Sequence, residues 1–151
     1  LLAAVVANDG LLPAPRLVTG RCGMLGLTDT PAPLPRASVV VAPAIARRLR
    51  QAMEAVATLG TGASLAPRGF ALAMKTGTAA EPGRGYHVNY IGAGPLPDPS
   101  FAFCVRVTNE RSSPAVTRAA REVTGRLLAA LAERRVSLET AARRQRLARA
   151  D

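Results

Sequence analysis

Residues 100–109, which read SFAFCVRVTN, alternate between larger apolar side chains and smaller or polar ones with a period of two. One set is Phe101, Phe103, Val105 and Val107, and the other set is Ala102, Cys104, Arg106 and Thr108. Successive side chains of a β-strand point to opposite faces, so this pattern predicts a strand with one buried and one exposed face. Such a strand needs a neighbour for its backbone hydrogen bonds and a packed layer over its apolar face.

Two further strands are predicted before this one. Residues 70–79 alternate between small and larger side chains, and residues 86–93 form a second strand-like segment. The connecting segments 80–85 (AEPGRG) and 94–99 (GPLPDP) are short and rich in glycine and proline, which is typical of turns. Three successive strands joined by short turns form an antiparallel meander.

Two helices are predicted before the strands. Residues 1–7 (LLAAVVA) end at the helix stop signal Asn8-Asp9-Gly10. Residues 42–59 carry Pro43 in the first turn, where proline is tolerated, and are followed by the stop Gly60-Thr61-Gly62. Apolar residues at helical spacing predict the buried face of the second helix, and they are Ile45, Leu49, Ala52 or Met53, Val56 and Leu59.

The last predicted helix begins at Ser113-Pro114, with serine as the N-cap and proline at the first helical position. Its apolar stripe is expected to pack on one face of the sheet, and it consists of Val116, Ala120, Val123, Leu127 and Leu131. Ser137 is a candidate N-cap for a further helix. The proline-rich residues 11–37 predict a loop with one short strand at 16–19.

The predicted order of helix, loop, helix, three antiparallel strands and helix defines an α+β fold, with helices packed against an antiparallel sheet. A length of 151 residues and a hydrophobic content of 48% suit one ordinary domain with a packed core. We assign residues 1–133 to this domain and residues 134–151 to an arginine-rich C-terminal tail. The first residue is leucine and no basic leader follows, so we expect the downstream part of a longer chain. No apolar run approaches the roughly 20 residues of a membrane span.

The net charge of +10 bears on solubility and on anionic partners rather than on the fold. We expect a solvated tail and no nucleic acid, because the chain has few aromatic residues for stacking and no recognised nucleic-acid-binding module. Cys22 and Cys104 do not make a disulfide framework; they either pair once or, as we favour, are buried thiols. His87 is the single histidine, so a typical zinc site is excluded and no cofactor is predicted.

Lys75 is the only lysine, and the other 19 of the 20 cationic side chains are arginines. A lysine ammonium is a compact donor of three hydrogen bonds that can transfer a proton when desolvated, whereas a guanidinium does neither well. Thr76 and Thr78 supply hydroxyl groups that can hold a carboxylate. Gly77 removes a side chain where a ligand or another backbone comes close. Strict alternation places Lys75 and Gly77 on one face of the strand and the two threonines on the other. Side chains from both faces can line one groove only if the strand twists along the rim of that groove.

The Lys75-Thr76-Gly77 triplet is the third motif of the serine acyltransferases that react with penicillin. Four segments in order, AVVANDGLLPAPRLV, MEAVATLGTG, ALAMKTGTAAEPG and NYIGAGPLPDPSFAFCVRV, resemble the C-terminal half of a penicillin-binding protein transpeptidase domain over residues 1–131. The first two motifs, S-x-x-K and Ser-x-Asn, are absent from these 151 residues. Met74 stands where the family usually has glycine, and Asn89-Tyr90 where it usually has a tryptophan.

The resemblance implies a partial penicillin-binding transpeptidase fold, similar to that of serine β-lactamases. The complete enzyme would attack the terminal D-Ala-D-Ala of a peptidoglycan stem peptide with an upstream serine and pass the acyl group to an amine of a neighbouring stem. Lys75 would tune the proton path, Thr76 and Thr78 would hold the terminal carboxylate, and the Thr78 N–H would form part of the oxyanion hole. The resemblance also implies β-lactam binding, cell-wall synthesis partners, and an extracytoplasmic location with an inner-membrane anchor upstream. The fragment by itself is expected to be inactive.

Two other interpretations stay open. A serine β-lactamase relative shares this chemistry, and a noncatalytic scaffold or sensor domain would keep the fold without the nucleophile. Ala79 after the motif resembles transpeptidases, and those of class B more than the bifunctional class. Among the neighbouring residues, we expect Glu81 to be a solvated turn residue and Tyr86 and Tyr90 to pack on strand faces. His87 is not expected to act as a general base.

Overall fold

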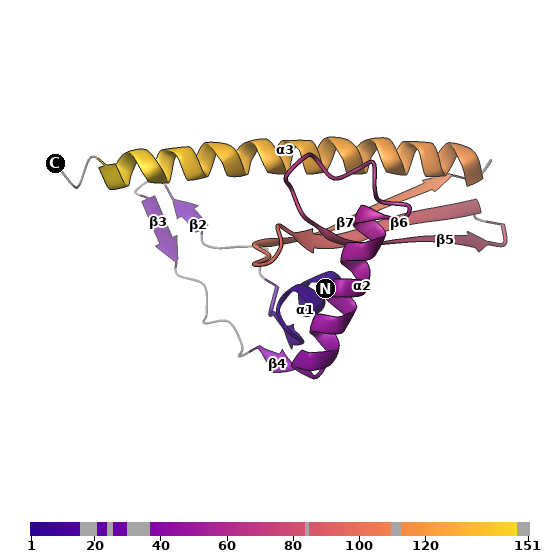
Figure 1. Cartoon of the computed structure of the whole chain (residues 1–151), viewed down its shortest axis with the longest axis horizontal. Coiled ribbons are helices and arrows are strands. Elements are labelled where there is room, and N and C mark those ends of the chain that lie inside the picture. The colour runs from indigo at the N-terminus through magenta and orange to yellow at the C-terminus, as the bar shows by residue number, and fades with distance from the viewer. Residues whose placement is uncertain (16–20, 24–25, 30–36, 84, 110–112, 148–151) are drawn as a thin grey trace.

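The computed structural model describes residues 1–15, 21–23, 26–29, 37–83, 85–109 and 113–147. Its centre is an antiparallel sheet with the order β5-β6-β7, formed by β5 (Ala73–Glu81), β6 (Gly85–Gly94) and β7 (Phe101–Asn109). The predicted meander is therefore confirmed (Figure 1). The strand predicted at residues 70–79 is β5, which begins at Ala73 and ends at Glu81 because it pairs with β6 over this range.

The two faces of β7 differ as its alternation predicts. Phe103 and Val105 are buried, whereas Cys104 and Arg106 are exposed. Cys104 is therefore a free, exposed thiol, and the expectation that it is buried was wrong because it lies on the face of β7 opposite the core. Gly92 of β6 allows this packing, since a Cβ atom there would lie 2.5 Å from the Ala73 carbonyl oxygen and 2.6 Å from the Phe103 ring.

Helix α3 (Ser113–Leu147) lies along one face of the sheet and contacts β6 and β7 (Figure 1). Val116 and Ala120 of the predicted stripe are fully buried, and Leu127 and Leu131 are partly buried against the core, whereas the fully buried Leu128 was not predicted. Val123 does not belong to the stripe, because it is 48% exposed and Thr124 takes the buried position one residue later. The Thr124 hydroxyl donates a hydrogen bond of 2.6 Å to the Ala120 carbonyl, so this polar side chain is satisfied inside the core.

Helix α3 continues to Leu147, so no separate helix begins at Ser137. A single helix suffices because no glycine, proline or capping turn interrupts residues 132–147. The division between residues 1–133 and 134–151 stays a prediction. Within the part of the chain that the structure describes, no helix combines the length and apolar character needed to cross a membrane.

Helices α1 (Leu2–Ala7) and α2 (Pro43–Thr58) complete the fold. Helix α1 contacts β6, β7 and α2 and lies on the side of the sheet away from α3, and α2 contacts β5 (Figure 1). Both helices occur where they are predicted. Arg50 of α2 donates hydrogen bonds to the carbonyl groups of Val6 and Ala7 and lies 2.8 Å from the Asp9 carboxylate. A cation at these last carbonyl groups stabilises the end of α1.

The predicted buried face of α2 is mostly wrong. Ile45, Leu49 and Leu59 are 48%, 44% and 88% exposed, whereas Ala46 and Ala57 are buried. The reason is that the hydrophobic core cluster takes in only the C-terminal end of α2, where Ala57 is buried and Val56 packs against it.

The segment before α2 contains short strands that the sequence analysis did not predict. β1 (Leu11–Leu12) pairs with β4 (Ser38–Val39), and β2 (Arg21–Gly23) pairs with β3 (Gly26–Asp29). Strands of two to four residues are too short to show an alternating pattern. The strand predicted at 16–19 lies outside the described residues.

Candidate functional site

The predicted site residues lie on an edge strand. Within the described residues β5 pairs with β6 alone, and its other edge has no strand partner. Lys75 pairs with Ile91 and Thr78 with Val88, so the four motif residues follow one another along this edge. An edge strand presents backbone N–H and C=O groups to which an extended peptide can add.

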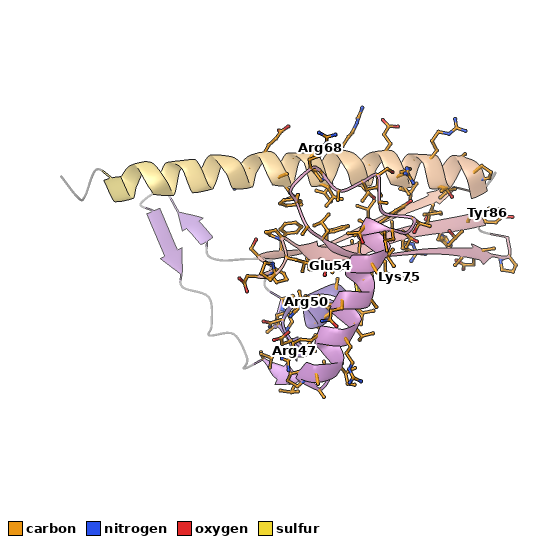
Figure 2. All side chains as sticks on the ribbon, in the orientation of Figure 1. Arg47, Arg50, Glu54, Arg68, Lys75 and Tyr86 are labelled. Carbon is orange, nitrogen blue, oxygen red and sulfur yellow. The ribbon has the colours of Figure 1, made fainter. Side chains whose placement is uncertain are left out.

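Lys75 faces a hollow between the sheet and the first two helices. This hollow has a volume of about 370 Å³ and is lined by apolar side chains of α1 and α2, by Ile91 of β6 and by Lys75 itself. Figure 2 shows Lys75 beside α2. The ammonium group donates a hydrogen bond to the Thr76 carbonyl oxygen. The only lysine is therefore exposed and lies at the wall of an apolar hollow.

Thr76 and Gly77 have different surroundings. Thr76 is half-buried, and its hydroxyl oxygen lies 2.9 Å from the hydroxyl oxygen of Thr61. A Cβ atom at Gly77 would meet nothing within 4 Å, so the strand is open at this point. Thr78 is exposed. The structure thus places Lys75 at the hollow, turns the Thr76 hydroxyl toward Thr61, and leaves Gly77 and Thr78 accessible.

His87 lies in a separate cluster at the far end of the sheet. Its Nδ1 atom is 2.9 Å from the Thr108 hydroxyl, and its Nε2 atom is 2.9 Å from a Glu81 carboxylate oxygen. Glu81 is six residues beyond Lys75 in β5, roughly 20 Å at about 3.3 Å per residue. The cluster links three strands and is too far away to exchange a proton with Lys75. Glu81 is not simply a solvated turn residue, because it ends β5 and binds His87.

The two tyrosines of β6 differ in exposure. Tyr90 is buried in the core, as expected for a packing residue, whereas Tyr86 lies near the turn and is 36% exposed. Among the described residues, no three His, Cys, Asp or Glu side chains are grouped as metal ligands.

Two residues near the motif were not predicted to belong to the site. Thr61 was assigned only to a helix stop, and Arg121 was not singled out, yet Thr61 contacts Thr76 and Arg121 contacts Thr61. The signal that could have found Thr61 is a hydroxyl between two glycines shortly before the motif strand.

An antiparallel sheet with packed helices and a Lys-Thr-Gly motif on its edge strand is the combination expected of the serine acyltransferases that react with penicillin. The family model of the penicillin binding protein transpeptidase domain matches residues 2–131. The chain therefore belongs to this family, and it carries part of the transpeptidase domain.

Solved structures agree with this assignment. The chain is similar to penicillin-binding protein A from Mycobacterium tuberculosis in an imipenem acyl-enzyme complex, with 27% identity and a TM-score of 0.67, covering 85% of this chain and 29% of that one. It is also similar to the D,D-transpeptidase domain of a peptidoglycan glycosyltransferase from Eggerthella lenta, with 26% identity and a TM-score of 0.68, covering 87% of this chain and 31% of that one. The chain thus spans less than a third of either structure. No curated protein sequence matches it significantly.

Proposed function

We propose that this chain forms the lysine and threonine wall of a D,D-transpeptidase active site, and that the attacking serine belongs to a part of the natural polypeptide outside residues 1–151. The observation that carries the proposal is the open edge of β5, where Lys75 borders an apolar hollow and Gly77 leaves free space. The natural polypeptide that contains residues 1–151 is called the complete polypeptide below.

In the proposed reaction the serine hydroxyl attacks the carbonyl carbon between the two terminal D-alanines of a stem peptide. The serine proton leaves along a path that Lys75 tunes, the C–N bond breaks, and D-alanine departs after its nitrogen gains a proton. An amine of a neighbouring stem then attacks the acyl-serine ester, forms the new amide and releases the serine. Thr76 and Thr78 would hold the terminal carboxylate, and the Thr78 N–H would stabilise the oxyanion.

Three features support this assignment of roles. An extended peptide can pair with the open edge of β5, which places its reacting carbonyl beside the motif. A lysine ammonium is a compact donor of three hydrogen bonds, and Lys75 holds this group at the wall of the hollow, beside the open strand edge. Thr78 is exposed and therefore accessible to a substrate carboxylate.

The proposal extends to ligands and location. β-Lactams would acylate the same serine, as the acyl-enzyme complexes of penicillin-binding protein A suggest for this family. We place the complete polypeptide at the extracytoplasmic face of the inner membrane, among other cell-wall synthesis proteins, because its proposed substrate is peptidoglycan. The membrane anchor would belong to residues outside this chain.

Fluorescent penicillin tests the proposal. We expect stable covalent labelling of the complete polypeptide and none of the 151-residue chain alone, because no S-x-x-K serine is present in it. The measurement is in-gel fluorescence after denaturation, with a heat-denatured sample of each polypeptide as the control. Labelling of the isolated chain would contradict the assignment of the nucleophile. A folded complete polypeptide that takes no label would favour the noncatalytic scaffold or sensor.

A further inference from the structure

The turn at residues 60–62 connects α2 to the segment leading into β5, and it packs directly on the strand. A Cβ atom at Gly62 would lie 2.1 Å from the Met74 sulfur and 3.1 Å from the Val56 carbonyl oxygen. The Gly62 N–H donates a 3.2 Å hydrogen bond to the same Val56 carbonyl. Met74 is completely buried and immediately precedes Lys75. The turn is therefore fixed to the end of α2 and rests against the residue before the motif lysine.

Thr61, at the centre of this turn, contacts the residue after the lysine. Its hydroxyl oxygen lies 2.9 Å from that of Thr76. On its other side, Arg121 of α3 donates a 3.4 Å hydrogen bond to the Thr61 carbonyl oxygen and a second hydrogen bond to the Ser64 hydroxyl. The turn thus connects the motif strand to both long helices.

The direction of the hydrogen bond between the two threonines matters for substrate binding. A hydroxyl group has one proton to donate and two lone pairs that accept. When Thr61 donates to Thr76, the Thr76 proton is free to point at a carboxylate. When Thr61 is replaced by a residue without a hydroxyl group, this arrangement is lost and the side chain of Thr76 is free to rotate.

Beyond Thr76, β5 is held by its pairing with β6. From Gly77 to Ala80 the strand is exposed, and among the described elements it pairs with β6 only. The hydroxyl of Thr61 contacts β5 at Thr76, the residue between Lys75 and the open position Gly77.

We propose that Thr61 is a positioning residue of the transpeptidase site. Its hydroxyl holds Thr76 and the adjoining part of β5 in place, and Arg121 holds Thr61 against α3. This inference rests on the proposed function, because it concerns the geometry of that same site.

The test is the second-order rate constant for acylation of the complete polypeptide by fluorescent penicillin. Thr61→Val keeps the branched shape and removes the hydroxyl, and it is expected to lower the rate constant about fivefold, the effect of losing one hydrogen bond. Thr61→Ser restores the hydroxyl and is expected to stay within about twofold of the wild type. Adding Thr76→Val to Thr61→Val should cost less than the two single effects combined, because the two residues act through one contact.

Two matched controls isolate the contact. Thr58→Val removes a hydroxyl that, among the described residues, donates to the Glu54 and Ala55 carbonyl groups of its own helix, so the wild-type rate is expected. Arg121→Gln is expected to lower the rate, whereas Arg126→Gln, which removes an exposed ion pair with Glu122, is not. Arg121→Gln also tests the proposal should Thr61→Val fail to fold.

The outcomes separate the inference from the proposed function. The positioning role alone is overturned if Thr61→Val and Arg121→Gln both react at the wild-type rate. It is also overturned if Thr61→Ser is as slow as Thr61→Val. A folded wild-type polypeptide that takes no penicillin overturns the proposed function and this inference together. A slow Thr61→Val with a rescued Thr61→Ser supports the positioning role.

Discussion

Replacing Lys75 with alanine is expected to lower the rate of penicillin acylation of the complete polypeptide by about 10²- to 10⁴-fold, the usual contribution of a positioned proton-transfer group. Lys75 borders an apolar hollow on the edge strand, and no other lysine in the chain can replace it. Lys75→Arg should be nearly as slow, because a guanidinium keeps the charge but does not transfer a proton. Stopped-flow or gel-based labelling with fluorescent penicillin measures both rates.

Arg48→Ala is the control for this prediction. Arg48 is exposed on α2 and does not line the hollow, so its replacement removes one positive charge without touching the site. The wild-type rate is expected for Arg48→Ala. A Lys75→Ala polypeptide that is folded and reacts as fast as the wild type would show that the lysine takes no part in acylation.

Replacing Leu128 with alanine is expected to cost about 2–5 kcal/mol of unfolding free energy, as is usual for a buried leucine. Leu128 belongs to α3 and is completely buried in the core, so the loss of its side chain leaves a cavity that its neighbours fill only in part. Urea denaturation of the complete polypeptide, followed by circular dichroism, measures the change.

Leu59→Ala is the matched leucine control. Leu59 is the C-cap residue of α2 and is 88% exposed, so its replacement is expected to change the unfolding free energy by less than about 0.5 kcal/mol. Equal effects of the two substitutions would mean that α3 does not pack on the sheet in solution.

The strands could be predicted because their alternation is local. Phe103 and Val105 face the core while Cys104 and Arg106 do not, and a period of two leaves no ambiguity about which residues share a face. Helix faces are less certain, because positions three and four residues apart both lie on one face. The assignment of Val123 to the buried stripe was wrong, because Thr124 takes the buried position and its hydroxyl is satisfied by the carbonyl of Ala120.

Tertiary contacts limit what the sequence reveals about α2. Ile45 and Leu49 have the correct helical spacing, but the period alone does not indicate how much of a helix meets the sheet. The described structure leaves Leu49 at the wall of the hollow.

The placement of the motif residues on a strand could be predicted, because Lys75 and the three residues after it stand out in the sequence. Thr61 and Arg121 could not, because Thr61 precedes Thr76 by 15 residues and Arg121 follows Thr61 by 60. Contacts of this kind depend on how the helices pack and leave no local pattern.

The most direct test of the account is to locate the penicillin adduct in the complete polypeptide by mass spectrometry of its proteolytic peptides. We expect a single penicilloyl group on a serine outside residues 1–151, within an S-x-x-K sequence. An adduct on a residue of this chain, or a folded polypeptide without any adduct, would contradict the claim that Lys75 and its strand serve a nucleophile supplied from elsewhere in the protein.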